Sequence, residues 1–402
     1  MRKVLKVSGF ALASLLVLIL LVISLNWQKA SQLFHVITLF DKGVIVSNFS
    51  NMREIAPTVT ISKTGPQHDF GHESRSLPAS YRYKGENKSL QSFLTRSSTT
   101  ALLVLKGNDI AYENYYQGTT EFDRRISWSM AKSFLSAIFG VAVNEGHIES
   151  LDEPVTDYVP ELKGTGYDGV TIKNVLQMSS GVGFNEDYQD FNSDINRFGR
   201  LMALGGSFDD FAKSLTNERE QGTYLHYVSI DTHVLGMVLR KATGRPIVEY
   251  FNDKLWSKLG TEEDAVYVTD TTGEPMVLGG LNLLTRDYAR FGKLYLDDGQ
   301  WNGEQIIPLS WVKTSVTADA PHLKPGKRDS AKGVLGYGYQ WWLPVDADEE
   351  FMAIGIYDQY IYINKKANVV IVKNSANIDF MKNNFESALE TTAAFRAIAA
   401  SL

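Results

Sequence analysis

The chain opens with a long run of apolar residues. Between Val7 and Gln28 no side chain is charged, and three basic residues precede the run. As a helix, this stretch of about 22 residues would be roughly 33 Å long, close to the thickness of a bilayer core. Residues 1–28 are therefore predicted to be a membrane anchor. A cleaved signal peptide is the alternative, although no small-x-small site follows the run.

The basic residues before the run predict the orientation of the chain. By the positive-inside rule they stay in the cytoplasm, so the rest of the chain faces outward. We expect a single-pass protein of the bacterial cytoplasmic membrane, attached through its N-terminal helix. Its folded body would then lie on the periplasmic or extracellular side.

The following segment, residues 29–90, lacks a sustained hydrophobic period. Its second half is rich in Pro, Gly, Ser and His, which is typical of extended connections. We predict a juxtamembrane and linker arm here. The folded body is predicted to span residues 91–395.

Alternating and helical patterns divide this body. Residues 99–116 are predicted to form a strand, a turn at 106–109 and a second strand. Helical patterns dominate residues 150–330, and strand patterns return over 337–375 before a final helix at 383–402. This order predicts an α/β (α+β) fold. An antiparallel sheet flanked by helices would be built from both ends of the body, with a mostly helical domain inserted.

Composition excludes several function classes. The net charge is −6, so no broad basic surface is expected and nucleic-acid binding is not predicted. The chain has no cysteine, which excludes disulfides, thiol nucleophiles and thiolate metal sites.

Candidate chemistry begins with Ser129 and Lys132, at the start of an apolar helical stretch. Residues three apart share one helix face, so the hydroxyl and the amine can be neighbours. A serine hydroxyl needs a base to become a nucleophile, and a lysine in a low-dielectric pocket loses its preference for the charged form. Chance is the alternative, because Ser310 and Lys313 have the same spacing outside a sustained apolar helix.

Longer motifs support the first pair. The stretch "SWSMAKSFLSAIFGVAVNEG" resembles the nucleophile region of the serine β-lactamase and penicillin-binding-protein superfamily, class C branch. The ordered set "HYVSIDTHVLGMVLRKATGRP", "GGLNLLTRDYARFGKLYLDDG", "YGYQWW" and "GIYDQYIYINKKANVVIVK" is most similar to 6-aminohexanoate-dimer hydrolases and related membrane-anchored serine hydrolases. This resemblance implies a β-lactamase/transpeptidase-like fold with its active site between the sheet and the helical domain.

The resemblance also implies a tyrosine that moves the proton of the nucleophile. Literal Tyr-x-Asn copies begin at Tyr112, Tyr250 and Tyr362, but two are in predicted strands and one is in an apolar helix. The match by context is Tyr227, followed two residues later by Ser229. Tyr227 is therefore the candidate general base and acid, and a buried structural tyrosine is the alternative.

The third element of the superfamily, Lys-Thr-Gly, is matched by position at Gly355, Ile356 and Tyr357. The backbone N–H of Ile356 is the candidate second oxyanion donor. The usual Lys or His is replaced by Tyr357, and Asp358 stands where Gly is usual, which weakens the case for recognising a carboxylate. A literal Lys-Thr-Gly at 63–65 precedes the nucleophile and is rejected.

The expected activity is hydrolysis of an amide or ester in a small molecule through an acyl-enzyme on Ser129. The resemblance implies that Tyr188, in a loop, contacts the substrate together with Ser229 and the 355–357 strand. No cofactor or metal is predicted. The alternatives are a β-lactamase or DD-peptidase-like activity, and a non-catalytic module that binds cell-wall peptides. The substrate and the oligomeric state do not follow from the sequence.

Overall fold

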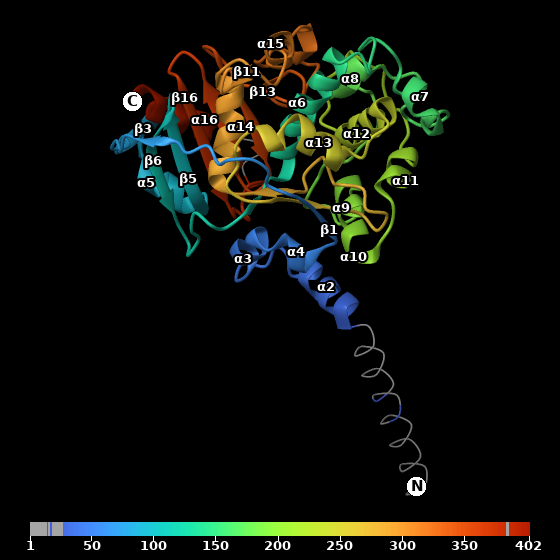
Figure 1. Cartoon of the computed structure of the whole chain (residues 1–402), viewed down its shortest axis with the longest axis horizontal. Helices are drawn as coiled ribbons and strands as arrows, with labels where there is room; N and C mark the ends of the chain where they lie inside the picture. Colours follow the sequence, from blue (N-terminus) through green and yellow to red (C-terminus); the bar gives the residue numbers. More distant parts are fainter. Residues whose placement is uncertain (1–13, 15–16, 18–26, 383–385) are drawn as a thin grey trace, which may run out of the picture.

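The computed structural model describes residues 14, 17, 27–382 and 386–402 (Figure 1). Most of the predicted membrane anchor, residues 1–28, lies outside the described residues. Within the part of the chain that is described, no helix combines the length and the apolar character needed to cross a bilayer.

An eight-stranded sheet brings together both ends of the body. The predicted hairpin at 99–116 is present, and its second strand also pairs in parallel with a short strand at the edge. The other neighbouring strands of this sheet pair antiparallel, which confirms the predicted fold class. In spatial order the strands are β12 (Gly336–Tyr337), β13 (Trp342–Leu343), β14 (Glu350–Gly355), β15 (Gln359–Asn364), β16 (Val369–Ser375), β5 (Thr99–Lys106), β6 (Asp109–Tyr115) and β2 (Gly71–His72).

Helices cover both faces of this sheet (Figure 1). Helix α14 (Thr285–Leu296) packs on one face, and α5 (Leu90–Arg96) and α16 (Glu386–Ala400) pack on the other. Side chains alternate along a strand, so Val370 and Val372 join the core beneath α14 while Ile371 packs with Phe395 of α16. The sheet is therefore a rigid layer buried on both sides.

The part of the body inserted between β6 and β12 is mostly helical. Its centre is α6 (Ala131–Asn144), which is apolar on nearly all sides and buried from Ala131 to Ala142; a helix of this kind belongs inside a core. Helix α12 (Ser229–Thr243) packs against it and ends at Gly244, whose φ of 64° is the left-handed conformation that glycine adopts readily. The remaining helices here are α7 (Val155–Tyr158), α8 (Ile172–Leu176), α9 (Asp194–Gly199), α10 (Leu201–Leu204), α11 (Phe208–Lys213), α13 (Ile247–Lys254) and α15 (Leu309–Ser315).

Residues 29–90, for which we expected an arm, contain several elements of regular structure. Strand β1 of this segment joins a second sheet in the order β1-β8-β9-β7. The elements of the segment are α2 (Trp27–Ile37), α3 (Ile45–Ser50), α4 (Met52–Ile55), β1 (Thr58–Ile61), β2, β3 (Ser80–Tyr83) and β4 (Glu86–Ser89), and their partners are β7 (Arg125–Ile126), β8 (Ala265–Val268) and β9 (Leu281–Leu283).

Buried polar groups hold α3 against the body. Arg125, on β7, donates from Nη1 to the carbonyl of Val46 at 2.8 Å and to Ser50 Oγ at 2.6 Å. Asn282, on β9, donates to the carbonyl of Phe49 at 3.0 Å. Because Arg125 and Asn282 are buried, the loss of these bonds would leave polar groups without partners.

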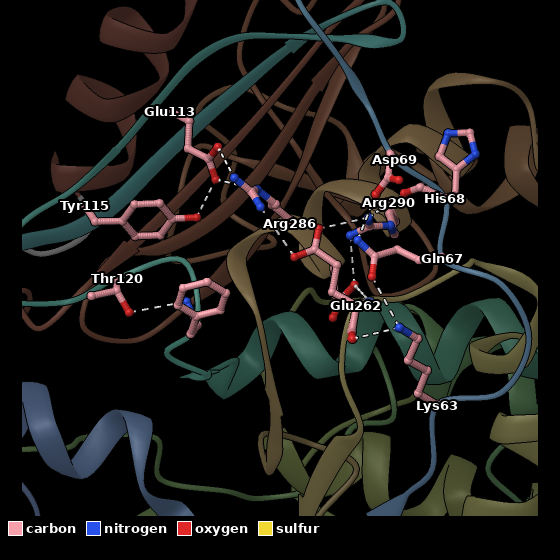
Figure 2. A network of polar contacts seen from close by, with 12 residues as sticks. Lys63, Gln67, His68, Asp69, Glu113, Tyr115, Thr120, Glu262, Arg286 and Arg290 are labelled. Carbon is pink, nitrogen blue, oxygen red and sulfur yellow. Dashed lines mark hydrogen bonds and ion pairs between the residues drawn. The ribbon is translucent and has the colours of Figure 1, made fainter.

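A network of ion pairs and hydrogen bonds fixes the stretch around His68, which follows β1 (Figure 2). Arg286 donates from two nitrogens to the Glu113 carboxylate, each at 2.8 Å. Arg290, which is fully buried, pairs with Glu262 at 2.9 Å and donates to the carbonyl of His68. Helix α14 is thereby connected both to the sheet and to the N-terminal segment.

Candidate active site

Ser129 lies in a short 3-10 turn, Trp128–Met130, between β7 and α6. Trp128 has a φ of 41°, a conformation that is costly for a bulky residue and that occurs mainly where the surroundings enforce it. Lys132, in the first turn of α6, places its Nζ 3.0 Å from Ser129 Oγ and donates to the carbonyl of Leu278 at 2.7 Å. The structure thus brings together the predicted nucleophile and its predicted base.

The surroundings of Lys132 favour the neutral amine. Burial lowers the pKa of Lys132 to about 7, although the nearby carboxylates of Glu186 and Asp231 act to raise it. Loss of solvation penalises the charged ammonium, and this effect is the larger one here. At neutral pH a substantial fraction of the enzyme therefore has an amine that can accept a proton from Ser129.

Tyr227 lies directly before α12 and completes the predicted trio. Its hydroxyl lies near enough to the Ser129 side chain for Ser129 to act on the pKa of the phenol, and its ring centroid is 5.3 Å from Lys132 Nζ. The ring is stacked on Trp342 with 5.3 Å between centroids, which fixes its orientation. Burial and the charge of Glu186 raise the pKa of Tyr227, while Ser129 acts in the opposite direction. Tyr227 is therefore a neutral phenol in the resting protein.

Glu186 is a site residue that the sequence analysis did not identify. Its carboxylate accepts hydrogen bonds from Ser229 Oγ at 2.6 Å, from the Ser229 N–H at 3.2 Å and from the Tyr188 hydroxyl at 2.7 Å. Tyr188 and Ser229 were predicted to contact substrate, and in the structure each has a hydroxyl bonded to this acid. Both also line the pocket at Ser129.

A second acid, Asp231, lies beneath the site on α12. It is fully buried and accepts a hydrogen bond from the Tyr167 hydroxyl at 2.9 Å. Burial raises the pKa of Asp231 well above its usual value, and bonds from Ser180 and Tyr167 oppose this shift. Asp231 lies near enough to Lys132 to act on the pKa of the lysine, which it raises.

The end of β14 approaches the nucleophile turn closely. A Cβ added at Gly355 would lie 2.5 Å from the carbonyl oxygen of Ser127 and 3.2 Å from the Ser129 nitrogen, so only glycine fits there. Ile356 and Tyr357 follow and line the pocket. Positive φ values of 60° at Tyr357 and 66° at Asp358 make the tight turn that leads into β15.

Asp358 does not line the pocket. It is buried, and its carboxylate accepts a hydrogen bond from Asn377 Nδ2 at 2.6 Å. The Asp358 carboxylate is therefore engaged by Asn377 and is not part of the pocket wall where an oxyanion would form. The tyrosines of the three literal Tyr-x-Asn copies, in β6, α13 and β15, have hydroxyls that hydrogen bond elsewhere, to Tyr116, Glu145 and Glu350.

The pocket beside Ser129 has a volume of about 470 Å³, within the range of small-molecule sites. Its wall includes residues of the N-terminal segment, which the sequence analysis did not anticipate. Phe40 stacks on Tyr357 with ring centroids 5.0 Å apart and also contacts Trp128. The pocket is lined by Val36, Ile37, Leu39, Phe40, Trp128, Ser129, Tyr188, Gln189, Phe191, Ile195, Asn196, Phe198, Gly199, Arg200, Met202, Ser229, Met276, Leu278, Gly279, Ile356 and Tyr357.

Comparison with known proteins agrees with this geometry. The family described as beta-lactamase matches residues 89–377, most of the chain. The chain belongs to the beta-lactamase family. The predicted family and fold class are confirmed.

Individual members of the beta-lactamase family give a finer comparison. The chain is 30% identical to a 6-aminohexanoate-dimer hydrolase of Paenarthrobacter ureafaciens, over 82% of this chain and 84% of the relative. A structure from Bacillus anthracis, assigned as a 6-aminohexanoate-dimer hydrolase, superposes with a TM-score of 0.79 at 25% identity, covering 90% and 95% of the two chains. A penicillin-binding protein of Bacillus halodurans shares the fold, with a TM-score of 0.57 at 17% identity, covering 75% and 99%. The named hydrolases among these relatives agree with serine hydrolase activity.

Proposed function

We propose that the protein is a serine hydrolase that cleaves an ester or amide through an acyl-enzyme on Ser129. The observation that carries the proposal is the 3.0 Å separation of Lys132 Nζ and Ser129 Oγ beside an open pocket. A base at hydrogen-bonding distance from a hydroxyl is the arrangement that nucleophilic catalysis requires. The pKa of Lys132, about 7, suits this role near neutral pH.

Acylation would proceed in balanced steps. Neutral Lys132 takes the Ser129 proton as Oγ bonds to the substrate carbonyl carbon, and the carbonyl oxygen becomes an anion. The N–H groups of Ser129 and Ile356 would stabilise this oxyanion. As the anion collapses, the bond to the leaving group breaks, and Tyr227 gives its proton to that group. The Lys132 ammonium then returns a proton to Tyr227, so the relay is reset.

Deacylation would reverse the relay. Water attacks the acyl carbon while its proton passes to the Tyr227–Lys132 pair, and Ser129 leaves with the proton returned to Oγ. Because the pKa of Tyr227 is raised, the phenol acts as a proton donor and relay, and Lys132 is the initial base. This division refines the sequence-based role of Tyr227 as general base and acid.

The rival functions need different side chains at the third motif of the superfamily, which residues 355–357 match by position. β-lactamase and DD-peptidase chemistry acts on carboxylate-bearing substrates, for which a Lys or His near the oxyanion site would be expected. Tyr357 occupies this place and stacks on Phe40, so the ester or amide assignment is favoured. A non-catalytic module that binds cell-wall peptides is less well supported, because binding alone gives no role to a buried amine beside a hydroxyl that opens to the pocket.

We also propose that the chain is anchored in the bacterial cytoplasmic membrane by its N-terminal run, with the pocket on the outer side. The support is the uncharged stretch from Val7 to Gln28 and the basic residues before it. Protease added to intact spheroplasts should digest the body of a single-pass protein oriented in this way. Protection of the body until the cells are lysed would contradict the proposal.

One experiment tests the chemistry directly. The intact protein and its Ser129→Ala variant are incubated with a fluorophosphonate and with panels of nitrophenyl esters, amides and β-lactams. The mass of each protein is then measured by mass spectrometry. A covalent adduct on the wild type alone, with turnover of esters or amides, supports the proposal. Turnover of β-lactams alone would favour the rival enzyme, and absence of any adduct or turnover would favour the binding module.

A further inference from the structure

The composition of the pocket wall points to a class of substrate. Most of the wall is formed by aliphatic and aromatic side chains, among them Leu39, Ile195 and Phe198, which are themselves buried; Gln189, Asn196 and Arg200 add polar groups. The apolar part of this surface gains free energy when it covers apolar groups. This part of the pocket therefore suits a hydrocarbon chain.

Charge in the pocket is nearly absent. Among the described residues that line it, Arg200 alone is charged. The Arg200 guanidinium donates a hydrogen bond to the backbone carbonyl of Phe191 at 2.6 Å. It also lies 4.2 Å from the centroid of the Phe191 ring. Arg200 is thus the one cation among these residues that an ionised acyl group could meet, and it already donates to a backbone carbonyl.

The rim of the pocket is apolar and exposed. Ile37 and Phe191 line the pocket and yet are 69% and 71% exposed. Phe34, one turn earlier on α2, and Leu204, on the adjacent α10, are 63% and 75% exposed. We call these four residues the rim. Exposed apolar residues that gather around a site commonly mark a contact with another apolar phase or partner.

The position of the rim in the chain identifies what it faces. The uncharged run ends before Lys29, and Ile37 follows eight residues later on α2. Helical geometry keeps these positions within roughly 12 Å of each other. If the run spans a bilayer, as proposed above, the pocket opening lies close to the lipid surface. Figure 1 shows α2 beside α10, on the side of the body where the described chain begins.

We propose that the pocket accepts a long aliphatic acyl chain and that the rim rests on the lipid surface from which this chain is drawn. The inference rests on the proposed function and specifies its substrate class. The acyl carbonyl would meet Ser129 while the hydrocarbon tail extends toward α2 and α9. The Phe40–Tyr357 stack then forms part of the pocket wall and takes no part in recognising a carboxylate.

A series of nitrophenyl esters from acetate to decanoate, kept below their micelle concentrations, tests the pocket with the full-length protein. We expect kcat/KM to rise by up to about fourfold for each added methylene until the pocket is filled. Gly199→Leu should blunt this rise, because Gly199 lines the pocket and a Cβ added there would meet no heavy atom within 4 Å. A flat profile, or a maximum at acetate in both proteins, would overturn the inference.

Vesicles test the rim. The full-length protein is reconstituted into phosphatidylcholine vesicles that carry a decanoyl ester, and turnover is compared with that of soluble butyrate. The double variant Phe34→Ser/Leu204→Ser should lose at least about fivefold on the embedded ester and keep its rate on butyrate. Phe122→Ser is the matched control, since Phe122 is 75% exposed and is absent from the pocket wall.

Two outcomes separate the possible failures. The lipid contact is wrong, while ester hydrolysis stands, if the rim variant and the control have the same activity on vesicles. The same conclusion holds if light scattering shows that the rim variant only converts a dimer into monomers. If the wild type hydrolyses no ester of any length and Ser129 takes no label, the proposed function itself has failed.

Discussion

Lys132 and Lys373 are both buried beside a serine hydroxyl, yet their surroundings differ. Lys132 Nζ is 3.0 Å from Ser129, which opens to the pocket, whereas Lys373 Nζ is 2.5 Å from Ser375, which is fully buried. Burial lowers the pKa of both lysines, to about 7 and about 8. A buried lysine with a lowered pKa beside a hydroxyl is thus not enough to mark a catalytic site.

The difference lies in access and in the second proton carrier. Ser129 meets both the pocket and the Tyr227 phenol, while Lys373 lies against the rings of Phe93 and Tyr360 in the core beneath α16. The Lys373 pair contributes to the packing of the sheet. The Lys132 pair sits where a substrate can reach it.

Removal of the two hydroxyls should give the largest contrast. Ser129→Ala is expected to lower kcat/KM for esters by about 10⁴-fold or more, because no nucleophile remains. Ser375→Ala should leave kcat/KM within about twofold, since Ser375 is fully buried and does not line the pocket, and should lower Tm by removing a buried hydrogen bond. Comparable losses of activity in both variants would show that the buried pair also serves the reaction.

Replacement of the two amines should have the next largest effect. Lys132→Met is expected to lower kcat by about 10³-fold because the general base is lost. Lys373→Met should keep most of the activity but unfold at a lower temperature, because Asp358 loses its nearby cation. Steady-state kinetics and thermal melts of the two variants distinguish these outcomes.

Loss of the phenol should be milder. Tyr227→Phe keeps the ring on Trp342 and is expected to lower kcat by about 10²-fold, with a larger loss for amides than for activated esters. Nitrophenolate leaves readily without protonation, whereas an amine does not. Equal losses on both substrates would contradict the role of Tyr227 as donor to the leaving group.

The smallest effect concerns pH. Since the reactive form has neutral Lys132, kcat/KM should rise with pH and level off above about 7, the pKa of this lysine. The Glu186 carboxylate raises that pKa, so Glu186→Gln should move the acidic limb to lower pH. A pH–rate profile checks the sign: an unchanged limb would mean that the charge of Glu186 does not act on Lys132, and a shift to higher pH would contradict the direction of its effect.

The predictable parts of the site depend on local patterns. The spacing of Ser129 and Lys132 follows from one helical turn, and the sheet strands follow from their alternation. Tyr227 required the order of several motifs, since three literal copies of its motif lie elsewhere. Glu186 carried no signal, because it stands among several acids in one loop and only the folded chain shows which of them faces Ser229.

The contribution of the N-terminal segment to the pocket wall could also not be predicted from the sequence. Phe40 meets Tyr357 across more than three hundred residues of chain, and Arg125 fixes the segment through a backbone carbonyl at Val46 that leaves no mark in the side-chain pattern. Contacts of this kind depend on tertiary packing. A segment without a hydrophobic period can therefore still form the wall of a site.

The stacking of Phe40 on Tyr357 has a practical consequence for anyone who shortens the gene. The region that the family shares begins at residue 89, and expression from that point would appear to retain every reactive group. The shortened protein would nonetheless lack one side of the pocket wall. The buried guanidinium of Arg125 would also lose its hydrogen-bond acceptors on α3. The smallest autonomous catalyst must begin near α2.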